Sequence, residues 1–197
     1  VLPVIRDTPV LAGVCGTDPF RLMDVFIAEL KTMGFTGVQN FPTVGLIDGD
    51  FRANLEATGM GYDKEIEAIQ IAHDLNMLTC PYGVNADDAK AMTKAGADVL
   101  VAHIGLTTSG SIGAGVAMTM DEAIEKVMEV YDAGKSVRDD VMVICHGGVF
   151  DEPPNVGKAL SRMPGVVGFF GASSIERLPT ERAIRRQVED FKDLKLA

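Results

Sequence analysis

Short apolar runs alternate with amphipathic stretches along the chain. Most of these runs are nearly continuous in apolar residues, as in VMVIC and DVLVAHIG. Strands of a parallel sheet have this composition because both faces of the sheet are covered. Repeated strands with helical segments between them indicate successive βαβ units. The pattern predicts six strands, at residues 10–16, 36–42, 78–82, 98–105, 141–146 and 166–171.

The segments between the strands carry helix signals. The first predicted helix spans residues 19–33, with its apolar residues at helical spacing. A second begins after Thr119, where Glu122 completes a capping box, and Gly134 is expected to end it. The last is expected to begin near Thr180. Its apolar stripe comprises Ile184, Val188 and Phe191.

Six βα units in one parallel sheet predict most of a β/α barrel of the TIM type. A closed barrel has eight strands, so six units leave two strands unpaired at an open seam. We expect either two further βα units ahead of Val1 or closure of the seam by another chain. The length suits one core, so residues 1–197 are expected to form one domain. The open edge also predicts a homo-oligomer.

Two connections are longer than usual for such units. Residues 43–62 follow the second predicted strand, and the Gly/Ser-rich segment TTSGSIGAG occupies residues 107–115. Loops that follow strands lie on the catalytic face of a β/α barrel, where long ones commonly serve as lids. The alternative is that both are surface insertions without such a role.

Composition narrows the range of partners. The chain has 28 acidic and 18 basic residues, a formal net charge of −10, and it lacks the basic stripe that nucleic-acid binding needs. It has neither an apolar run of about 18 residues nor an N-terminal basic segment followed by an apolar one, so no membrane span or signal peptide is expected. We therefore predict a cytoplasmic protein whose three cysteines are reduced and buried.

Polar residues suited to catalysis stand near the carboxyl ends of several predicted strands. His103 and His146 end neighbouring strands, which lie about 4.8 Å apart, so their rings are expected to meet. Imidazole suits general acid/base work, although a strand histidine is often a hydrogen-bonded core residue. Asn40 and Tyr82 are predicted to face the same mouth and stabilise negative charge on oxygen. Asp18 is expected to cap a helix instead.

Two glycine-containing segments follow the last two predicted strands. They are CHGG at residues 145–148 and GASS at residues 171–174. Glycines let backbone N–H groups approach an anion, and barrels bind phosphate at this position. Ser173 is also placed to cap the next helix in a capping box with Glu176. The predicted anion-binding residues are Gly147, Gly148, Gly171, Ser173 and Ser174.

Long stretches of the chain carry a family resemblance. They are PVLAGVCGTDPF, GVQNFPTVGLIDG, NLEATGMGYDKE, ADVLVAHIGLTTSGSIGA, VICHGG and GFFGASSIERLPTE. With these stretches the chain resembles the phosphoenolpyruvate hydrolase-like TIM-barrel family, whose barrel also forms the C-terminal part of plant tomato mosaic virus resistance-type proteins. The resemblance implies two further strands upstream of PVLAG. It also implies kinship with phosphonopyruvate hydrolase and isocitrate lyase, enzymes that use Mg²⁺ to hold a 2-oxo acid or enolate.

Three functional hypotheses follow. The first is an enzyme that acts on a small phosphorylated or 2-oxo-carboxylate anion, with His146 or His103 as general acid/base and Asn40 and Tyr82 as donors to oxygen. The second is a barrel that senses a metabolite or binds a partner without catalysis. A third is a non-haem iron oxygenase in which both histidines and one carboxylate bind the metal.

Overall fold

The computed structural model describes residues 1–115 and 118–195 and contains seven strand segments, all joined in parallel. Each predicted strand run contains one segment, except that residues 78–82 contain one segment and the first residue of a second. The pairing order is β1-β2-β3 in one sheet and β4-β5-β6-β7 in the other. The segments are β1 (Leu11–Gly13), β2 (Gly37–Gln39), β3 (Leu78–Thr79), β4 (Tyr82–Gly83), β5 (Val99–His103), β6 (Met142–His146) and β7 (Gly168–Phe169).

The division between β3 and β4 lies at Pro81, which has no N–H to donate to a sheet. Hydrogen bonds to both neighbouring strands continue across this point. The Cys80 N–H donates to the carbonyl of Val38, and the Val101 N–H donates to the carbonyl of Pro81. The two sheets are therefore continuous through one strand, as the sequence predicts.

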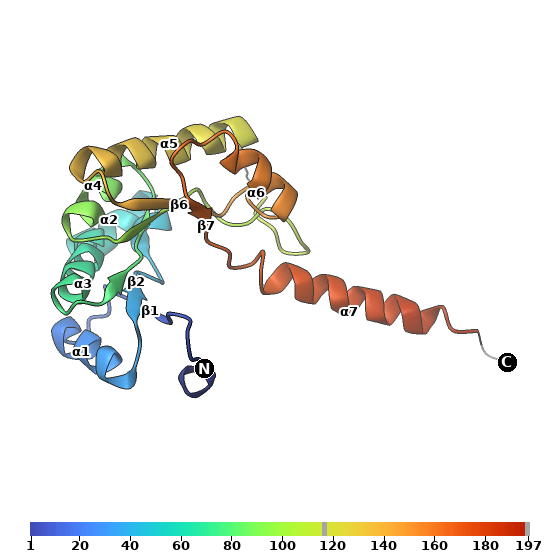
Figure 1. Ribbon diagram of the computed structural model, residues 1–197, viewed down its shortest axis with the longest axis horizontal. Helices are drawn as coiled ribbons and strands as arrows, with labels where there is room; N and C mark the ends of the chain where they lie inside the picture. The colour runs from blue at the N-terminus through green and yellow to red at the C-terminus, as the bar shows by residue number, and fades with distance from the viewer. Residues whose placement is uncertain (116–117, 196–197) are drawn as a thin grey trace.

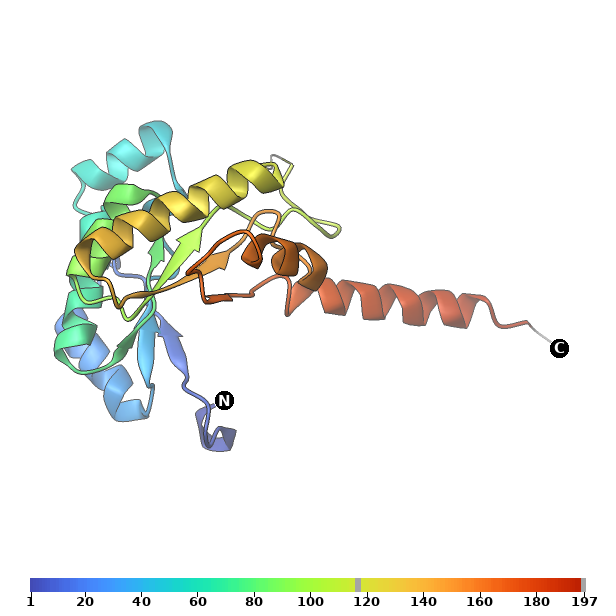
Figure 2. The same ribbon diagram turned by 45° about the horizontal axis from the view of Figure 1, so that its top comes forward.

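Helices cover one face of this curved array of strands. In both views α1, α3, α4 and α5 lie side by side along the outside of the strands (Figure 1, Figure 2). The α-helices are α1 (Met23–Met33), α2 (Gly49–Ala57), α3 (Tyr62–Asp74), α4 (Ala86–Lys94), α5 (Met120–Val137), α6 (Pro153–Leu160) and α7 (Arg177–Lys192), and short 3₁₀ turns span Leu2–Val4 and Val44–Leu46.

Apolar residues separate into two clusters, one on each face of the sheet. The large cluster fills the space between strands and helices and includes Val38, Ile69 and Leu100. A small cluster on the opposite face contains Tyr82 and Val101. Because side chains alternate along a strand, these clusters distinguish an outer, helix-covered face from the inner face of a barrel.

The sheet remains open within the described residues, since β1 and β7 each pair on one side only. Helix α7 projects away from the body of the molecule (Figure 1). Its predicted stripe is present but exposed, with Ile184, Val188 and Phe191 at least half accessible.

In the described part of the chain no helix is long and apolar enough to cross a membrane. All three cysteines are free, and Cys80 and Cys145 are buried as predicted, whereas Cys15 is only half-buried.

Helix boundaries correct several predictions. The Asp18 carboxylate accepts the Phe20 N–H at 2.9 Å in a turn, and α1 begins only at Met23, with Leu22 as its N-cap residue. Asp18 therefore does not cap this helix. Gly134 does not end α5, which continues to Val137. Gly134 instead packs closely on Leu100, where a Cβ would lie 2.9 Å from the leucine side chain.

Two further expectations concern capping and the long connection. The Thr119–Glu122 capping box is present at the start of α5. The predicted Ser173–Glu176 box is wrong, because α7 begins at Arg177 and Glu176 is its N-cap residue. The segment 43–62 is largely ordered secondary structure, since it contains a 3₁₀ turn and α2.

Candidate functional site

The two strand-end histidines meet on the inner face, as predicted. His103 and His146 are direct partners in the pairing of β5 with β6, and their ring centroids lie 4.5 Å apart. Tyr82, from β4, packs on both rings at centroid distances of 4.7 and 5.2 Å. Phe170, just after β7, packs against His146 at 5.4 Å. Three neighbouring strands, β4, β5 and β6, thus bring one phenol and two imidazoles together.

Hydrogen bonds fix different tautomers for the two histidines. The Nδ1 atom of His103 accepts the backbone N–H of Gly105 at 3.1 Å, so the ring proton of the neutral imidazole is on Nε2. The Nδ1 atom of His146 lies 2.7 Å from the carbonyl oxygen of Phe170. A carbonyl oxygen only accepts, so this Nδ1 carries the proton and Nε2 keeps its lone pair. His103 therefore offers a donor, and His146 offers a base.

Burial keeps these groups uncharged at neutral pH. Desolvation, together with the neighbouring His146, lowers the pKa of His103 to about 3. Desolvation also lowers the pKa of His146, against the opposing effect of the Phe170 carbonyl. Burial raises the pKa of Tyr82 to about 12, with a smaller contribution from Cys80, so its hydroxyl keeps its proton. The cluster thus has a lone pair and two neutral donors.

Asn40 takes a different position from the predicted one. It lies on the outer side of the sheet, where its amide nitrogen donates to the Glu65 carboxylate at 2.5 Å. Its carbonyl oxygen accepts the Tyr82 N–H at 2.7 Å. The Tyr82 N–H thus finds a side-chain acceptor at the point where Pro81 divides β3 from β4. Asn40 therefore holds the backbone of Tyr82 in place, and its polar atoms do not face the mouth.

Glu65 was not among the predicted site residues. It comes from α3 and is fully buried, and its second oxygen accepts the Val44 N–H at 2.7 Å. Burial raises its pKa, and the hydrogen bonds from Val44, Thr43 and Asn40 oppose that rise. The hydroxyl of Tyr62, also from α3, donates to the Tyr82 carbonyl at 2.5 Å. Helix α3 thus anchors the β4 backbone from outside the sheet.

The glycine pair after β6 is explained by close backbone packing. Gly147 has φ of 87°, and a Cβ on it would lie 2.1 Å from the Gly105 carbonyl oxygen. The Gly148 N–H donates to that same oxygen at 3.1 Å. This contact uses the Gly148 donor that the predicted anion site requires. Gly148 therefore joins the loops after β5 and β6, and its N–H is not free for an anion.

The GASS segment begins directly beside the histidines. Gly171 follows Phe170, whose carbonyl binds His146. The Ser173 carbonyl accepts N–H groups from the first turn of α7, and Ser173 and Ser174 are both half-buried. Anion binding by Gly147, Gly171 and the two serines remains a prediction.

The Gly/Ser-rich loop is docked above this end of the sheet. Arg177 of α7 donates to the Ser109 carbonyl at 2.9 Å, and the Ser111 N–H donates to Glu181 at 2.9 Å. The Ser109 hydroxyl also hydrogen bonds to the buried Asp151 carboxylate. The loop therefore lies on the face where the strands end, as expected for a lid.

Nearly the whole chain matches one protein family. Residues 1–194 match the phosphoenolpyruvate hydrolase-like family. The chain belongs to this family. It is 53% identical over 196 residues to the ToMV susceptible protein tm-1(GCR26) of Solanum lycopersicum, covering 100% of this chain and 26% of the relative. The chain thus spans about a quarter of the length of that tomato protein.

Solved structures show the same fold for this phosphoenolpyruvate hydrolase-like chain. One is 2,3-dimethylmalate lyase, a PEP mutase/isocitrate lyase superfamily member, with a TM-score of 0.54 at 10% identity over 95% of this chain and 63% of that one. Another, assigned as a phosphonomutase, is from Burkholderia cenocepacia J2315, with a TM-score of 0.52 at 14% identity over 88% and 74% of the two chains. The TIM-type fold is thereby established.

Magnesium, which the sequence resemblance implies, does not fit the side chains around the histidines. Mg²⁺ prefers carboxylate oxygens in octahedral geometry, whereas the inner cluster offers imidazoles and a protonated phenol. Within residues 1–115 and 118–195, no group of three or more His, Cys, Asp or Glu residues is arranged to hold a metal ion. The same observation leaves the iron-oxygenase hypothesis without a carboxylate partner.

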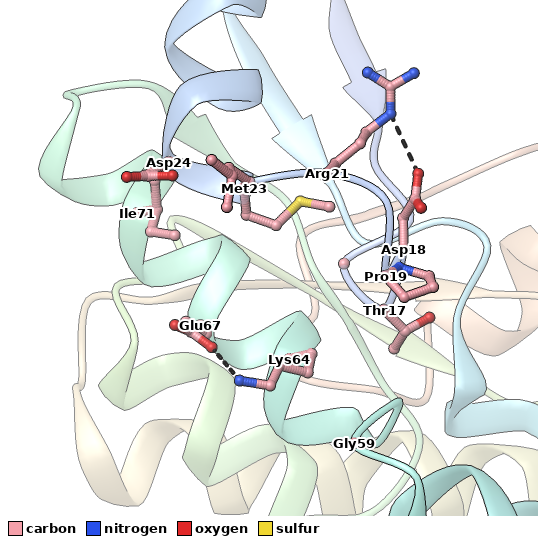
Figure 3. Close-up of a pocket in the computed structure, with 12 residues that line it drawn as sticks. Thr17, Asp18, Pro19, Arg21, Met23, Asp24, Gly59, Lys64, Glu67 and Ile71 are labelled. Carbon is pink, nitrogen blue, oxygen red and sulfur yellow. Dashed lines mark hydrogen bonds and ion pairs between the residues drawn. The ribbon is translucent and has the colours of Figure 1, made fainter.

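A separate cavity of about 480 Å³ lies between the loop after β1 and α3 (Figure 3). It contains the strand-end carboxylate Asp18. Four of its charged groups form two pairs, Arg21 with Asp18 at 3.2 Å and Lys64 with Glu67 at 2.8 Å. These are partly exposed pairs, which contribute little on their own. Asp18 is therefore tied to Arg21 at the edge of the sheet.

Proposed function

We propose that this family member is an enzyme that acts on a small anionic substrate, either phosphorylated or a 2-oxo carboxylate, of the phosphoenolpyruvate or phosphonopyruvate type. The observation that carries the proposal is the pairing of His103 and His146, with opposite tautomers, beside Tyr82. A base and neutral donors are the groups that proton transfer to and from a carbonyl compound requires.

The chemistry assigns a role to each side chain. The free lone pair on Nε2 of His146 accepts a proton, from water or from carbon beside a carbonyl group. When the proton comes from water, the water oxygen forms a bond to phosphorus, the bond from phosphorus to the leaving enolate breaks, and its electron pair ends on the enolate oxygen. When the proton comes from carbon, the C–H electron pair forms a C=C bond and the carbonyl π pair moves onto oxygen. In both cases the proton on His146 can return to the enolate carbon. The Nε2–H of His103 and the hydroxyl of Tyr82 then donate to the oxygen that becomes negative. Neutral donors in a water-poor site stabilise such charge effectively.

Burial supports this division of roles. The lowered pKa of His146 keeps its base form populated at neutral pH. His103 remains a neutral donor, since its pKa is about 3. Asn40 contributes indirectly, because it positions the Tyr82 backbone from the outer face.

The first experiment screens the full-length protein against phosphoenolpyruvate, phosphonopyruvate, inorganic phosphate and oxalate by thermal shift, with and without Mg²⁺, and then follows product formation by NMR. Ligand binding to the folded state raises its melting temperature. For a compound that is turned over, His146→Gln is expected to lower kcat by about 100-fold or more, the usual contribution of a general base. His73→Gln, on the exposed side of α3, is the matched control.

The outcomes separate enzyme from sensor. Turnover that depends on His146 supports the proposal. Tight binding with no product from any compound would instead favour a metabolite-sensing barrel. Full turnover by His146→Gln would remove the base from the mechanism.

A further inference from the structure

Gln39, the last residue of β2, has a buried side chain with an unsatisfied donor. Only 8% of the residue is exposed. Its side-chain nitrogen Nε2 makes no hydrogen bond within the described residues. Buried amides are almost always hydrogen bonded, so an exception of this kind in a folded protein calls for an explanation. Strain, a catalytic role or a bound water or ion can explain such an exception.

The direction of the Gln39 side chain follows from its neighbours. Val38 belongs to the outer cluster under the helices, and Asn40 bonds Glu65 of α3 on that same side. Alternation along the strand therefore places Gln39 on the inner face. There its carboxamide points towards the Tyr82 hydroxyl, and this polar contact lowers the pKa of that hydroxyl against the effect of burial. The contact is too loose to count as a hydrogen bond, so the Nε2 donor keeps no well-formed partner. Gln39 thus lies at the same cluster as the two histidines.

We propose that Gln39 is a ligand-binding residue of this site, and that its side-chain amide donates a hydrogen bond to a carboxylate or carbonyl oxygen of the substrate. The inference rests on the proposed function, and it adds a fourth strand to the site. The bound oxygen satisfies the buried N–H that the protein leaves unpaired.

The absence of charge in the cluster indicates which oxygen is bound. His103, His146 and Tyr82 are all neutral at pH 7. A dianionic phosphate buried among them would lack a counter-charge, which is costly. A carboxylate or carbonyl oxygen carries less charge and is well matched by neutral amide, imidazole and phenol donors. The site is therefore expected to bind oxalate more tightly than inorganic phosphate.

The test measures oxalate and phosphate binding to the full-length protein by isothermal titration calorimetry. Gln39→Met keeps the length of the side chain but removes both N–H donors. Gln39→Glu replaces the donors with an acceptor of negative charge. The matched control is Gln187→Glu, the same chemical change on the exposed surface of α7. Melting temperatures without ligand are recorded for every variant.

We expect oxalate affinity to fall at least tenfold in Gln39→Met and further in Gln39→Glu, with Gln187→Glu unchanged. Gln39→Met should melt no lower than the wild type, because it removes a buried donor that has no partner. This combination of weaker binding and undiminished stability distinguishes a ligand contact from a structural role. If Gln39→Glu fails to fold, Gln39→Met decides the question.

Other outcomes would overturn the inference. Gln39→Met that binds oxalate within threefold of the wild type removes Gln39 from the site, as does a lowered melting temperature with unchanged affinity. Tighter binding of phosphate than of oxalate refutes the assigned oxygen class. If turnover depends on His146 but the Gln39 substitutions leave oxalate binding unchanged, only this inference fails. If the wild type binds no compound of the panel, the proposed function fails with it.

Discussion

Replacing Asn40 with alanine should destabilise the protein strongly, because one buried side chain serves two buried partners. Asn40 is 1% exposed. Its amide donates to the Glu65 carboxylate, and its carbonyl accepts the Tyr82 N–H. Loss of a hydrogen bond to a charged group costs about 1.5–3 kcal/mol and loss of a neutral one about 1 kcal/mol. We therefore expect Asn40→Ala to lower the free energy of unfolding by about 3 kcal/mol.

Urea denaturation at pH 7, followed by circular dichroism, measures this change. Asn54→Ala on the exposed surface of α2 is the control and should lie within about 0.5 kcal/mol of the wild type. An Asn40→Ala variant as stable as Asn54→Ala would refute the reasoning, since the buried bonds would then contribute nothing net.

Asn40→Asp tests the electrostatic part of the same argument. Aspartate keeps an acceptor for the Tyr82 N–H but places a second carboxylate beside Glu65. Two buried carboxylates raise each other's pKa, so the folded state holds a proton that the unfolded state releases. Stability should then increase as the pH falls from 7 towards the pKa of an unfolded carboxyl, near 4. A flat pH dependence relative to the wild type would contradict the assigned contact.

Three further predictions concern the two histidines and the glycine that follows β6. Because the pKa of His146 is lowered, kcat/KM for a turned-over substrate should be constant near pH 7 and fall only below about pH 6.5; an acid limb that survives in His146→Gln would exclude this assignment. His103 has a pKa near 6.5 in the unfolded chain but about 3 in the folded protein. The free energy of unfolding should therefore fall between these pH values on acidification, by up to about 1.4 kcal/mol per pH unit. His103→Gln should show a shallower slope in urea titrations. Gly147→Ala should cost more than about 2 kcal/mol by the same assay, because of its positive φ and the Gly105 carbonyl, whereas Gly157→Ala in α6 has open space and should be neutral or stabilising.

The strands could be predicted because a parallel sheet covered on both faces has a simple composition. The six apolar runs all contain strands, and even the Pro81 break falls inside a predicted run. Helix starts were less predictable, because local side-chain bonds compete with helix formation. At Asp18 the carboxylate bonds the Phe20 N–H in a turn, which delays α1 to Met23.

The meeting of His103 and His146 was predictable for a similar reason. Both end strands that neighbour each other, and their pairing register places them side by side. Their tautomers could not be predicted, because they depend on hydrogen bonds to two backbone groups in loops. These groups are the N–H of Gly105, after β5, and the carbonyl of Phe170, after β7. The position of Asn40 was also missed. Successive side chains of a strand point to opposite faces of the sheet, so an error of one residue exchanges the two faces. Gln39 therefore occupies the inner position that was predicted for Asn40.

Glu65 does not stand at the end of a strand, but the sequence still marks it as unusual. The buried face of α3 comprises Tyr62, Glu65, Ala68, Ile69 and Ala72, so a carboxylate occupies a position of the apolar stripe. An ionised side chain in such a position requires partners, and partners on a helix that covers a sheet must come from the strands beneath it. Glu65 therefore predicts a polar residue on the outer face of a nearby strand, and Asn40 is that residue. In a β/α barrel, a charged residue within a helix's apolar stripe thus indicates where the backbone of the site is anchored, even when the ligand-binding side chains lie on the opposite face.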